Sequence, residues 1–300
     1  MDMTQDKCCR HGANLRRRRR RRRKILRSII FSCSIIAVAV FVAVGSRMIT
    51  SGDGGTNRYD VEAGNNTYDN AVIENSKITE KNKIQNNQSM LDDIMNSTQY
   101  PKQLQELALK NEEALEFVYD YPAEHVKEHT IDLTEEASMD SVPLFVQWDK
   151  RWGYEKYSGN FFAASGCGPT TLSMVVVYLT HNREASPIAV AKYSKEAGYS
   201  VDGSGSSWTL ISEGCRHYGV KAKTVALDES RMKAELDAGH PIVVNVGPGD
   251  FTDTGHFMVI TGYDDEGFSI NDPNSIEKSG KRWLFKNISS QIRAVWSMYV

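Results

Sequence analysis

The feature that most constrains this chain is an uncharged, apolar run over residues 28–46, bounded by Arg27 and Arg47. As a helix, its 19 residues would span roughly 28 Å, close to the thickness of the hydrocarbon core of a bilayer. Eight consecutive arginines at 16–23 precede it, and such a cluster stays on the cytoplasmic side of a membrane. We therefore expect a basic cytoplasmic tail over 1–27, a single-pass transmembrane signal anchor over 28–46, and an extracytoplasmic remainder.

Two other interpretations of this end stay open. Ala43 and Gly45 could form the small-residue site of a cleaved signal peptide, in which case the mature protein would be secreted. The arginines could also form a nuclear-localisation or nucleic-acid patch, although an adjoining membrane span argues against it. The first 50 residues carry a net charge of +11 and the remainder −13, so the body of the chain is not predicted to bind nucleic acid.

The chain after the anchor divides by composition. Residues 47–98 are rich in Asn, Gly, Ser, Thr, Asp and Lys, and are predicted to form a flexible extracytoplasmic stalk. Residues 99–138 are predicted to be a short helical lead-in of one or two helices. Apolar residues there fall close to helical spacing, namely Leu104, Leu107, Ala108, Leu115 and Val118.

Residues 139–300 show helical patterns first and strand patterns later. A short apolar run at 142–148 suggests an edge strand. Helices are predicted at 166–180, 186–198, 206–219 and 228–239, followed by β-branched and aromatic strands at 241–247, 256–264, 267–272, 281–285 and 294–300. This order predicts an α+β domain instead of an alternating α/β domain.

Cys167 is the candidate nucleophile. It lies between Gly166 and Gly168 immediately before an apolar helix, where unpaired N–H groups and the helix dipole favour a thiolate. The flanking glycines would let another chain approach closely. The alternative is a buried structural thiol, or a disulfide with Cys215, which otherwise resembles a core residue on the apolar face of a helix.

His256 is the candidate base, since it opens a predicted strand just after the Gly- and Asp-rich run 247–255. Asp272 is the candidate partner that orients the imidazole. In an antiparallel hairpin, the strand that leaves from His256 and the strand that returns to Asn271 bring Asp272 back to the level of His256. An Asp before Pro is also a common turn residue.

Gln147 is the candidate oxyanion donor, together with the backbone N–H of Cys167. The sequence calls for no metal and no organic cofactor. No cysteine pair has the short spacing typical of a zinc site.

These residues resemble a known family. The resemblance rests on Val142-Pro143, Gln147, Trp152-Gly153, Gly166-Cys167-Gly168-Pro169-Thr170, Thr254-Gly255-His256-Phe257 and Asn271-Asp272-Pro273. Together they are similar to the papain-type bacterial peptidases related to the double-glycine leader peptidases, which trim bacteriocin leaders, and most of all to a stand-alone exported branch. The resemblance covers residues 100–300 and implies a papain-like fold with a Cys167–His256–Asp272 site and an assisting glutamine.

Two departures from that family bear on function. The transporter-linked leader peptidases carry their glutamine a few residues before the cysteine, whereas residues 161–166 contain none. The chain also lacks transporter segments and a P-loop. We therefore expect a cysteine peptidase acting on a peptide or protein substrate outside the cytoplasm. The alternatives are a cell-wall peptide amidase or acyl transferase on the same fold, and a non-catalytic peptide-binding module.

Overall fold

The computed structural model describes the backbone of residues 67–300 and the side chains of residues 79–300. The predicted basic tail, the predicted membrane anchor and the first part of the predicted stalk all lie outside the described residues. Within the described part of the chain, no helix combines the length and the apolar character needed to cross a membrane.

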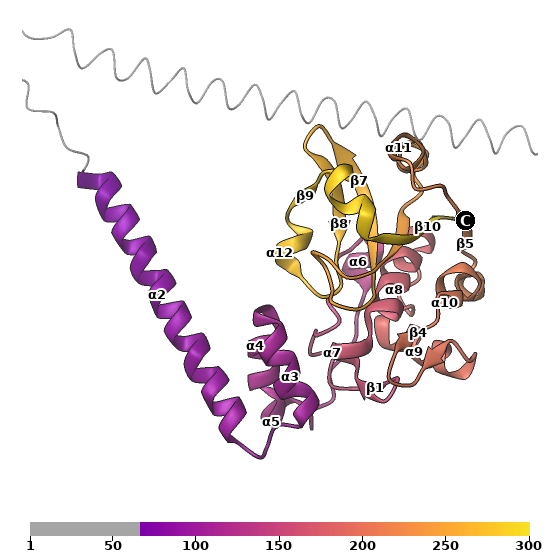
Figure 1. The fold of residues 1–300 in the computed structure, drawn as a ribbon. Helices are drawn as coiled ribbons and strands as arrows, with labels where there is room; N and C mark the ends of the chain where they lie inside the picture. Colours follow the sequence, from indigo (N-terminus) through magenta and orange to yellow (C-terminus); the bar gives the residue numbers. More distant parts are fainter. Residues whose placement is uncertain (1–66) are drawn as a thin grey trace, which may run out of the picture. The chain divides into compact units, whose positions relative to one another are not determined.

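Helix α2 occupies Thr67–Asn96 (Figure 1), so the prediction of a flexible stalk over 47–98 is wrong for this part. The helix buries Ile94 near its C-terminal end, where Met90 and Leu91 pack beside it against the helices that follow. Most helical stability in proteins comes from such tertiary packing. The polar composition that suggested disorder therefore does not decide the structure of this segment.

The lead-in is helical, as predicted, but it contains more segments than expected. These are α3 (Lys102–Lys110), the 3-10 helix η1 (Glu112–Ala114), α4 (Leu115–Tyr119), α5 (Tyr121–Glu124) and α6 (Thr134–Ser138). All five apolar residues at helical spacing are buried. They pack in one cluster with Phe161 and Ala163, which lie just before Cys167, so the lead-in belongs to the folded body.

The predicted edge strand at 142–148 is wrong, because this segment belongs to no sheet and ends in a turn at 147–148. Its backbone groups are bound from elsewhere. The Asn271 side chain donates to the carbonyls of Val142 and Pro143, and the Gln147 N–H donates to the Pro273 carbonyl. The segment is thus held beside the C-terminal end of β8 (Gly267–Asn271). A small hairpin follows, formed by β1 (Lys156–Tyr157) and β2 (Asn160–Phe161).

The helices of the body begin with α7 (Phe162–Ser165), α8 (Cys167–Thr180) and α9 (Pro187–Glu196), and the Ser186 side chain caps α9. A two-stranded sheet of β3 (Ser200–Val201) and β4 (Gly205–Ser206) separates them from the next helices. The single helix predicted at 206–219 is instead α10 (Thr209–Ser212) followed by the 3-10 helix η2 (Gly214–Tyr218). The Tyr199 ring packs so closely on Gly214 that a Cβ there would lie 3.1 Å from it. Helix α11 (Glu229–Asp237) follows, with the Asp228 side chain as its cap.

A six-stranded antiparallel sheet completes the body, in the order β5-β10-β6-β7-β8-β9. Its strands are β5 (Lys221–Thr224), β6 (Ile242–Val246), β7 (His256–Asp264), β8 (Gly267–Asn271), β9 (Arg282–Trp283) and β10 (Ile292–Tyr299). Short helices α12 (Ile276–Ser279), α13 (Phe285–Ile288) and η3 (Ser289–Gln291) lie between the last strands. The five strands predicted between 241 and 300 are all present in this sheet, whose edge strand β5 was not predicted. The short strands β1, β2, β3 and β4 were not predicted either.

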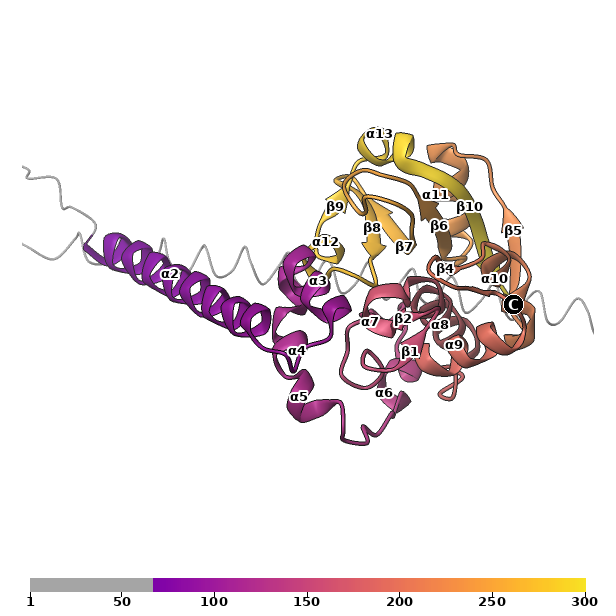
Figure 2. The ribbon, with the colours of Figure 1, turned by 60° about the horizontal axis from the view of Figure 1, so that its bottom comes forward.

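Both faces of the sheet are covered. Val243, Phe257 and Val259 face the core around α8, whereas Ile242 and Val244 face a second core that includes Met232 of α11. This alternation follows from the period of two along a strand. Figure 2 shows α7, α8 and α9 gathered beside one end of the sheet. The predicted mixed architecture of helices and an antiparallel sheet is therefore confirmed.

Candidate active site

Cys167 is the first residue of α8, and its neighbouring glycines fit the chain's own packing. A Cβ on Gly168 would lie 2.5 Å from the Ser206 Oγ, and a Cβ on Gly166 would lie 2.6 Å from the Phe162 ring. The sequence led us to expect another chain to approach closely at these glycines. In the structure, that space is occupied by β4 and by the preceding helix α7 of the same chain. Cys167 and Cys215 are both free thiols, so the disulfide alternative is excluded.

The thiol of Cys167 lies in surroundings that stabilise its negative form. Burial raises the pKa of this thiol, but a hydrogen bond and positive charge from His256 lower it more, and the N–H groups of Phe257 and Gly168 also donate to the sulfur. The net effect is a lowered pKa. The arrangement therefore favours the thiolate, which is the nucleophilic form of a cysteine.

His256 opens β7 and is almost fully buried. Its Nε2 lies 2.7 Å from Oδ1 of Asp272, which leaves Nδ1 as the ring nitrogen available to Cys167. Burial lowers the pKa of His256, but the Asp272 charge and hydrogen bond, followed by those of Cys167, raise it overall. The contacts with Asp272 and Cys167 therefore favour the charged form of the imidazole.

Neighbouring elements fix the position of β7. The Thr171 hydroxyl of α8 donates to the Phe257 carbonyl at 3.1 Å, and the Asn245 amide of β6 donates to the His256 carbonyl at 3.2 Å. The first bond ties the helix that carries the thiol to the strand that carries the imidazole. Hydrogen bonds of this kind hold a reactive pair at constant separation.

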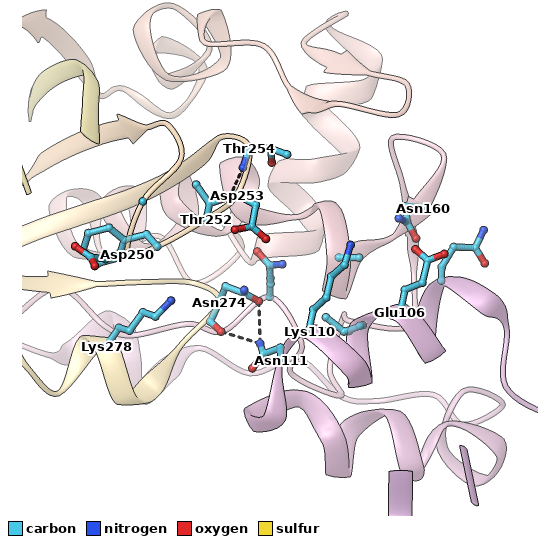
Figure 3. Close-up of a pocket in the computed structure, with 16 residues that line it drawn as sticks. Glu106, Lys110, Asn111, Asn160, Asp250, Thr252, Asp253, Thr254, Asn274 and Lys278 are labelled. Carbon is cyan, nitrogen blue, oxygen red and sulfur yellow. Dashed lines mark hydrogen bonds between the residues drawn. The ribbon is translucent and has the colours of Figure 1, made fainter. Parts of the chain in front are cut away.

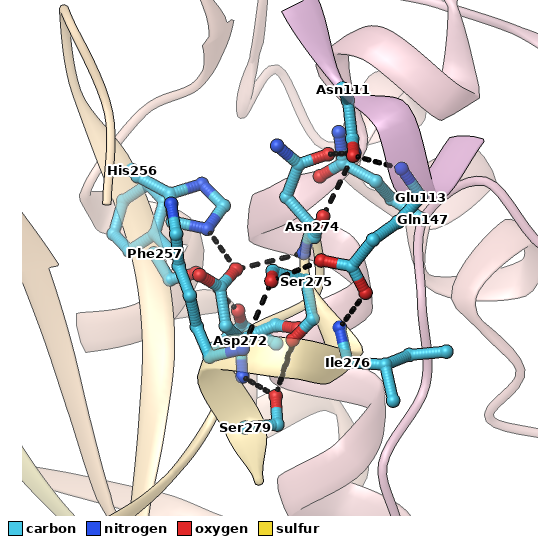
Figure 4. Close-up of polar contacts among 12 residues, drawn as sticks. Asn111, Glu113, Gln147, His256, Phe257, Asp272, Asn274, Ser275, Ile276 and Ser279 are labelled. Atoms are coloured by element: carbon cyan, nitrogen blue, oxygen red, sulfur yellow. Dashed lines mark hydrogen bonds and ion pairs between the residues drawn. The ribbon is translucent and has the colours of Figure 1, made fainter. Parts of the chain in front are cut away.

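Asp272 lies directly after β8 and is completely buried. The β7–β8 hairpin brings it to His256, as the sequence predicts. Its Oδ1 also accepts the Asn274 N–H at 2.8 Å, and its own N–H donates to the Ser279 Oγ at 2.9 Å. Its Oδ2 is buried without a partner among the described residues. Figure 4 shows this turn facing the His256 ring.

Gln147 connects the two sides of the site. Its backbone N–H donates to the Pro273 carbonyl at 2.7 Å, and its side-chain amide donates to the Ala163 carbonyl at 2.7 Å. Its Oε1 is buried without a partner in the described chain. One of the two amide hydrogens is therefore occupied, and only the second could serve an oxyanion.

A cavity of about 460 Å³ adjoins these residues (Figure 3). Gln147 and Asn274 line it beside the site, and Thr254 lines it two positions before His256. The loop 249–254 forms one side, and Glu106 and Lys110 of α3 lie on the other. The cavity is thus bounded partly by the lead-in.

Sequence reasoning missed the residues that hold the Asp272 turn. Asn111 and Glu113 contact that turn across more than 160 positions of sequence. No motif or periodicity links such distant residues, so nothing in the sequence alone could have identified them. Within the described residues, no group of three or more His, Cys, Asp or Glu side chains is placed to hold a metal ion.

Cys167, His256 and Asp272 thus meet at the junction of a helix and a sheet, in the order of contacts that thiol-dependent hydrolases use. The chain belongs to the Peptidase_C39 like family, whose model matches residues 139–300. No curated protein matches the chain.

Two solved structures are similar to part of the chain. One is the peptidase domain of Streptococcus ComA, described as a bi-functional ABC transporter involved in a quorum-sensing pathway. It is 20% identical with a TM-score of 0.36, and the match covers 45% of this chain and 90% of that domain. The other is a putative C39-like peptidase from Bacillus anthracis. It is 16% identical with a TM-score of 0.34, and the match covers 53% of this chain and 95% of that protein.

Proposed function

We propose that this chain is a papain-like cysteine peptidase that hydrolyses peptide bonds through Cys167, His256 and Asp272. Membership of the Peptidase_C39 like family supports a peptidase. The observation that carries the proposal is the line of contacts from the thiol through His256 to the Asp272 carboxylate, together with the lowered pKa of Cys167. A metal is not needed for this chemistry.

The reaction proceeds in two steps. The Cys167 thiolate attacks the scissile carbonyl carbon, the C–N bond breaks, and the His256 imidazolium gives its proton to the leaving amine. Neutral His256 then takes a proton from water, whose oxygen attacks the thioester. The C–S bond breaks, and the acid product and the Cys167 thiolate are released beside the imidazolium.

Asp272 and Gln147 have supporting roles in this proposal. Asp272 orients the imidazole and stabilises its charge through the 2.7 Å contact with Nε2. Gln147 donates the second hydrogen of its amide to the oxyanion, since the first is bound to the Ala163 carbonyl. The adjoining cavity would receive the substrate peptide.

We further propose that the chain is anchored in the membrane through residues 28–46, with its peptidase domain extracytoplasmic. The supports are the length of that apolar run and the eight arginines before it. Protease added to intact cells should then degrade the C-terminal domain and spare an epitope tag on the N-terminus. Protection of both ends would contradict this topology.

The catalytic proposal is tested by removing each thiol in the full-length chain. Cys167→Ala should abolish hydrolysis of unfolded proteins and peptides, whereas Cys215→Ala should retain it, since Cys215 is a core residue. Release of new amino termini is the measurement. Equal loss in both variants, or consumption of muropeptides with no cleavage of proteins, would overturn the proposal.

A further inference from the structure

We propose that Asn111 and Glu113 of the lead-in are positioning residues that hold the turn carrying Asp272. The catalytic unit then extends N-terminally beyond the family-matched residues 139–300. This inference rests on the proposed function, because it assigns a role in orienting the Cys167–His256–Asp272 site. The contacts are drawn in Figure 4.

Glu113 binds the far side of the Asp272 turn with both carboxylate oxygens. Its Oε1 accepts a short hydrogen bond from the Ser275 hydroxyl, and its Oε2 accepts the N–H groups of Ile276 at 2.7 Å and Glu277 at 3.1 Å. Hydrogen bonds to an ionised carboxylate are stronger than those between neutral groups. One lead-in side chain therefore fixes three consecutive residues, beginning three positions after Asp272.

Asn111 binds the middle of the same turn. Its amide nitrogen donates to the Asn274 carbonyl at 2.9 Å and lies 3.1 Å from the Asn274 Oδ1. Its own Oδ1 accepts the Glu113 N–H at 3.0 Å, which fixes the Asn111 side chain. Asn274 in turn donates its N–H to the Asp272 Oδ1, the oxygen that contacts His256. A continuous line of hydrogen bonds thus runs from the lead-in to the imidazole.

The lead-in also packs on the other side of the site. Leu104, Leu107 and Phe117 are buried in one cluster with Phe161 and Ala163, which precede Cys167 by only a few residues. The Ala163 carbonyl accepts the Gln147 amide in the same region. The lead-in therefore contacts both the segment that leads to the thiol and the turn that carries the carboxylate.

This double contact has a consequence for catalysis. A thiolate–imidazolium pair depends on the direction of the Asp272 carboxylate, and a shift of about 1 Å at a supporting residue can cost a hundredfold in rate. Asp272 Oδ2 has no partner among the described residues, so the carboxylate depends on Oδ1 for its orientation. Weakening the hydrogen bonds from Asn111 and Glu113 to the turn should therefore make the Cys167 thiolate less stable and less reactive.

The test uses the full-length chain and follows alkylation of Cys167 by iodoacetamide from pH 5 to 10, resolved by peptide mass spectrometry. The variants are Glu113→Gln and Asn111→Ala. The matched control is Glu116→Gln, which changes an exposed glutamate of the lead-in that does not hydrogen-bond to the turn. In both variants we expect the pH midpoint of Cys167 alkylation to rise by about one unit, which corresponds to about tenfold slower labelling at pH 6. In the control we expect the wild-type midpoint.

Ser275→Ala provides a second route, because it removes the hydroxyl bound by Glu113 from the turn itself. If Glu113 acts through this contact, Glu113→Gln combined with Ser275→Ala should shift the midpoint less than the two single shifts added together. Hydrolysis should show a lower kcat with little change in KM. If Glu113→Gln loses its cooperative thermal unfolding, Asn111→Ala and Ser275→Ala carry the test, since both leave the Glu113 carboxylate in place.

The outcomes separate this inference from the proposed function. A wild-type Cys167 that titrates like an ordinary thiol would overturn the proposed function itself. A wild-type Cys167 with a lowered midpoint, together with the same midpoint in Glu113→Gln, Asn111→Ala and Ser275→Ala, would overturn only the positioning role. An equal shift in Glu116→Gln would also overturn it, since the effect would then come from charge alone.

Discussion

Cys167 and Cys215 are the two cysteines of the described chain, and their surroundings give them opposite properties. Burial raises the pKa of both thiols. At Cys215, in η2, burial is the dominant cause and raises the pKa to about 11. At Cys167, the His256 hydrogen bond and charge reverse the effect of burial. The difference in pKa between the two thiols therefore comes from their hydrogen-bonding and charged neighbours, and not from how deeply each is buried.

The two thiols lie in different regions of the fold, one in the apolar core and the other at a junction of several elements. Cys215 lies among apolar side chains of the core around α8, where the charge of Arg216 lowers the thiol pKa by less than burial raises it. Cys167 lies where α8, β7 and the Asp272 turn meet, and those elements bring an imidazole and backbone N–H groups to the sulfur. A core cysteine contributes packing, whereas an activated cysteine requires several separate segments to converge.

Removing the imidazole should have the largest effect on this contrast. In His256→Ala, the Cys167 thiol loses its strongest stabilising partner and should return to a pKa of about 8.5 or above. Labelling of Cys167 by iodoacetamide at pH 6 should then fall about a hundredfold, since under about 1% of such a thiol is ionised there. Labelling of Cys215 should be unchanged and slow. Unchanged labelling of Cys167 would show that His256 does not activate it.

Removing the carboxylate charge should have an intermediate effect. Asp272 raises the pKa of His256, so Asp272→Asn should let the imidazolium lose its proton at lower pH. In the wild type, kcat/KM should fall on the acid side as the thiolate is protonated and on the alkaline side as the imidazolium is lost. In the variant, the alkaline limb should move down by about one pH unit or more, with about tenfold lower activity. An alkaline limb that stays in place would exclude this role for Asp272.

The smallest effect is expected from the core cysteine. Cys215→Ala leaves a small cavity among fully buried side chains and should lower the free energy of unfolding by about 1–2 kcal/mol. Urea denaturation followed by circular dichroism measures this change. Cys167→Ala, at a partly buried position, should cost less. A larger loss at Cys167 than at Cys215 would reverse the assignment of the two thiols to site and core.

Much of the site follows from local patterns. The helix that opens at Cys167 and the strand that opens at His256 are both where glycines and apolar periodicity place them. The approach of Asp272 to His256 follows from the length of one hairpin, which is a short-range property. Gln147 is less predictable, because its two partners, Ala163 and Pro273, come from different parts of the chain.

The errors in prediction share one physical cause. The polar helix α2 is packed at its C-terminal end through Ile94, although its composition suggested a flexible stalk. The apolar segment at 142–148 pairs with no strand, since Asn271 and Pro273 bind its backbone groups instead. The helix after Ser206 is interrupted where Tyr199 packs on Gly214. In each case a distant contact outweighed a local preference.

The sequence by itself determined the class of fold, the helix that begins at Cys167, and the hairpin that brings Asp272 to His256. These depend on periodicity, turn residues and chain length between neighbours, all of which are local. Only the tertiary structure decided that Asn111 and Glu113 hold the Asp272 turn. A hydrogen bond between residues more than 160 positions apart leaves no trace in local pattern, because it exists only once separate segments have packed together.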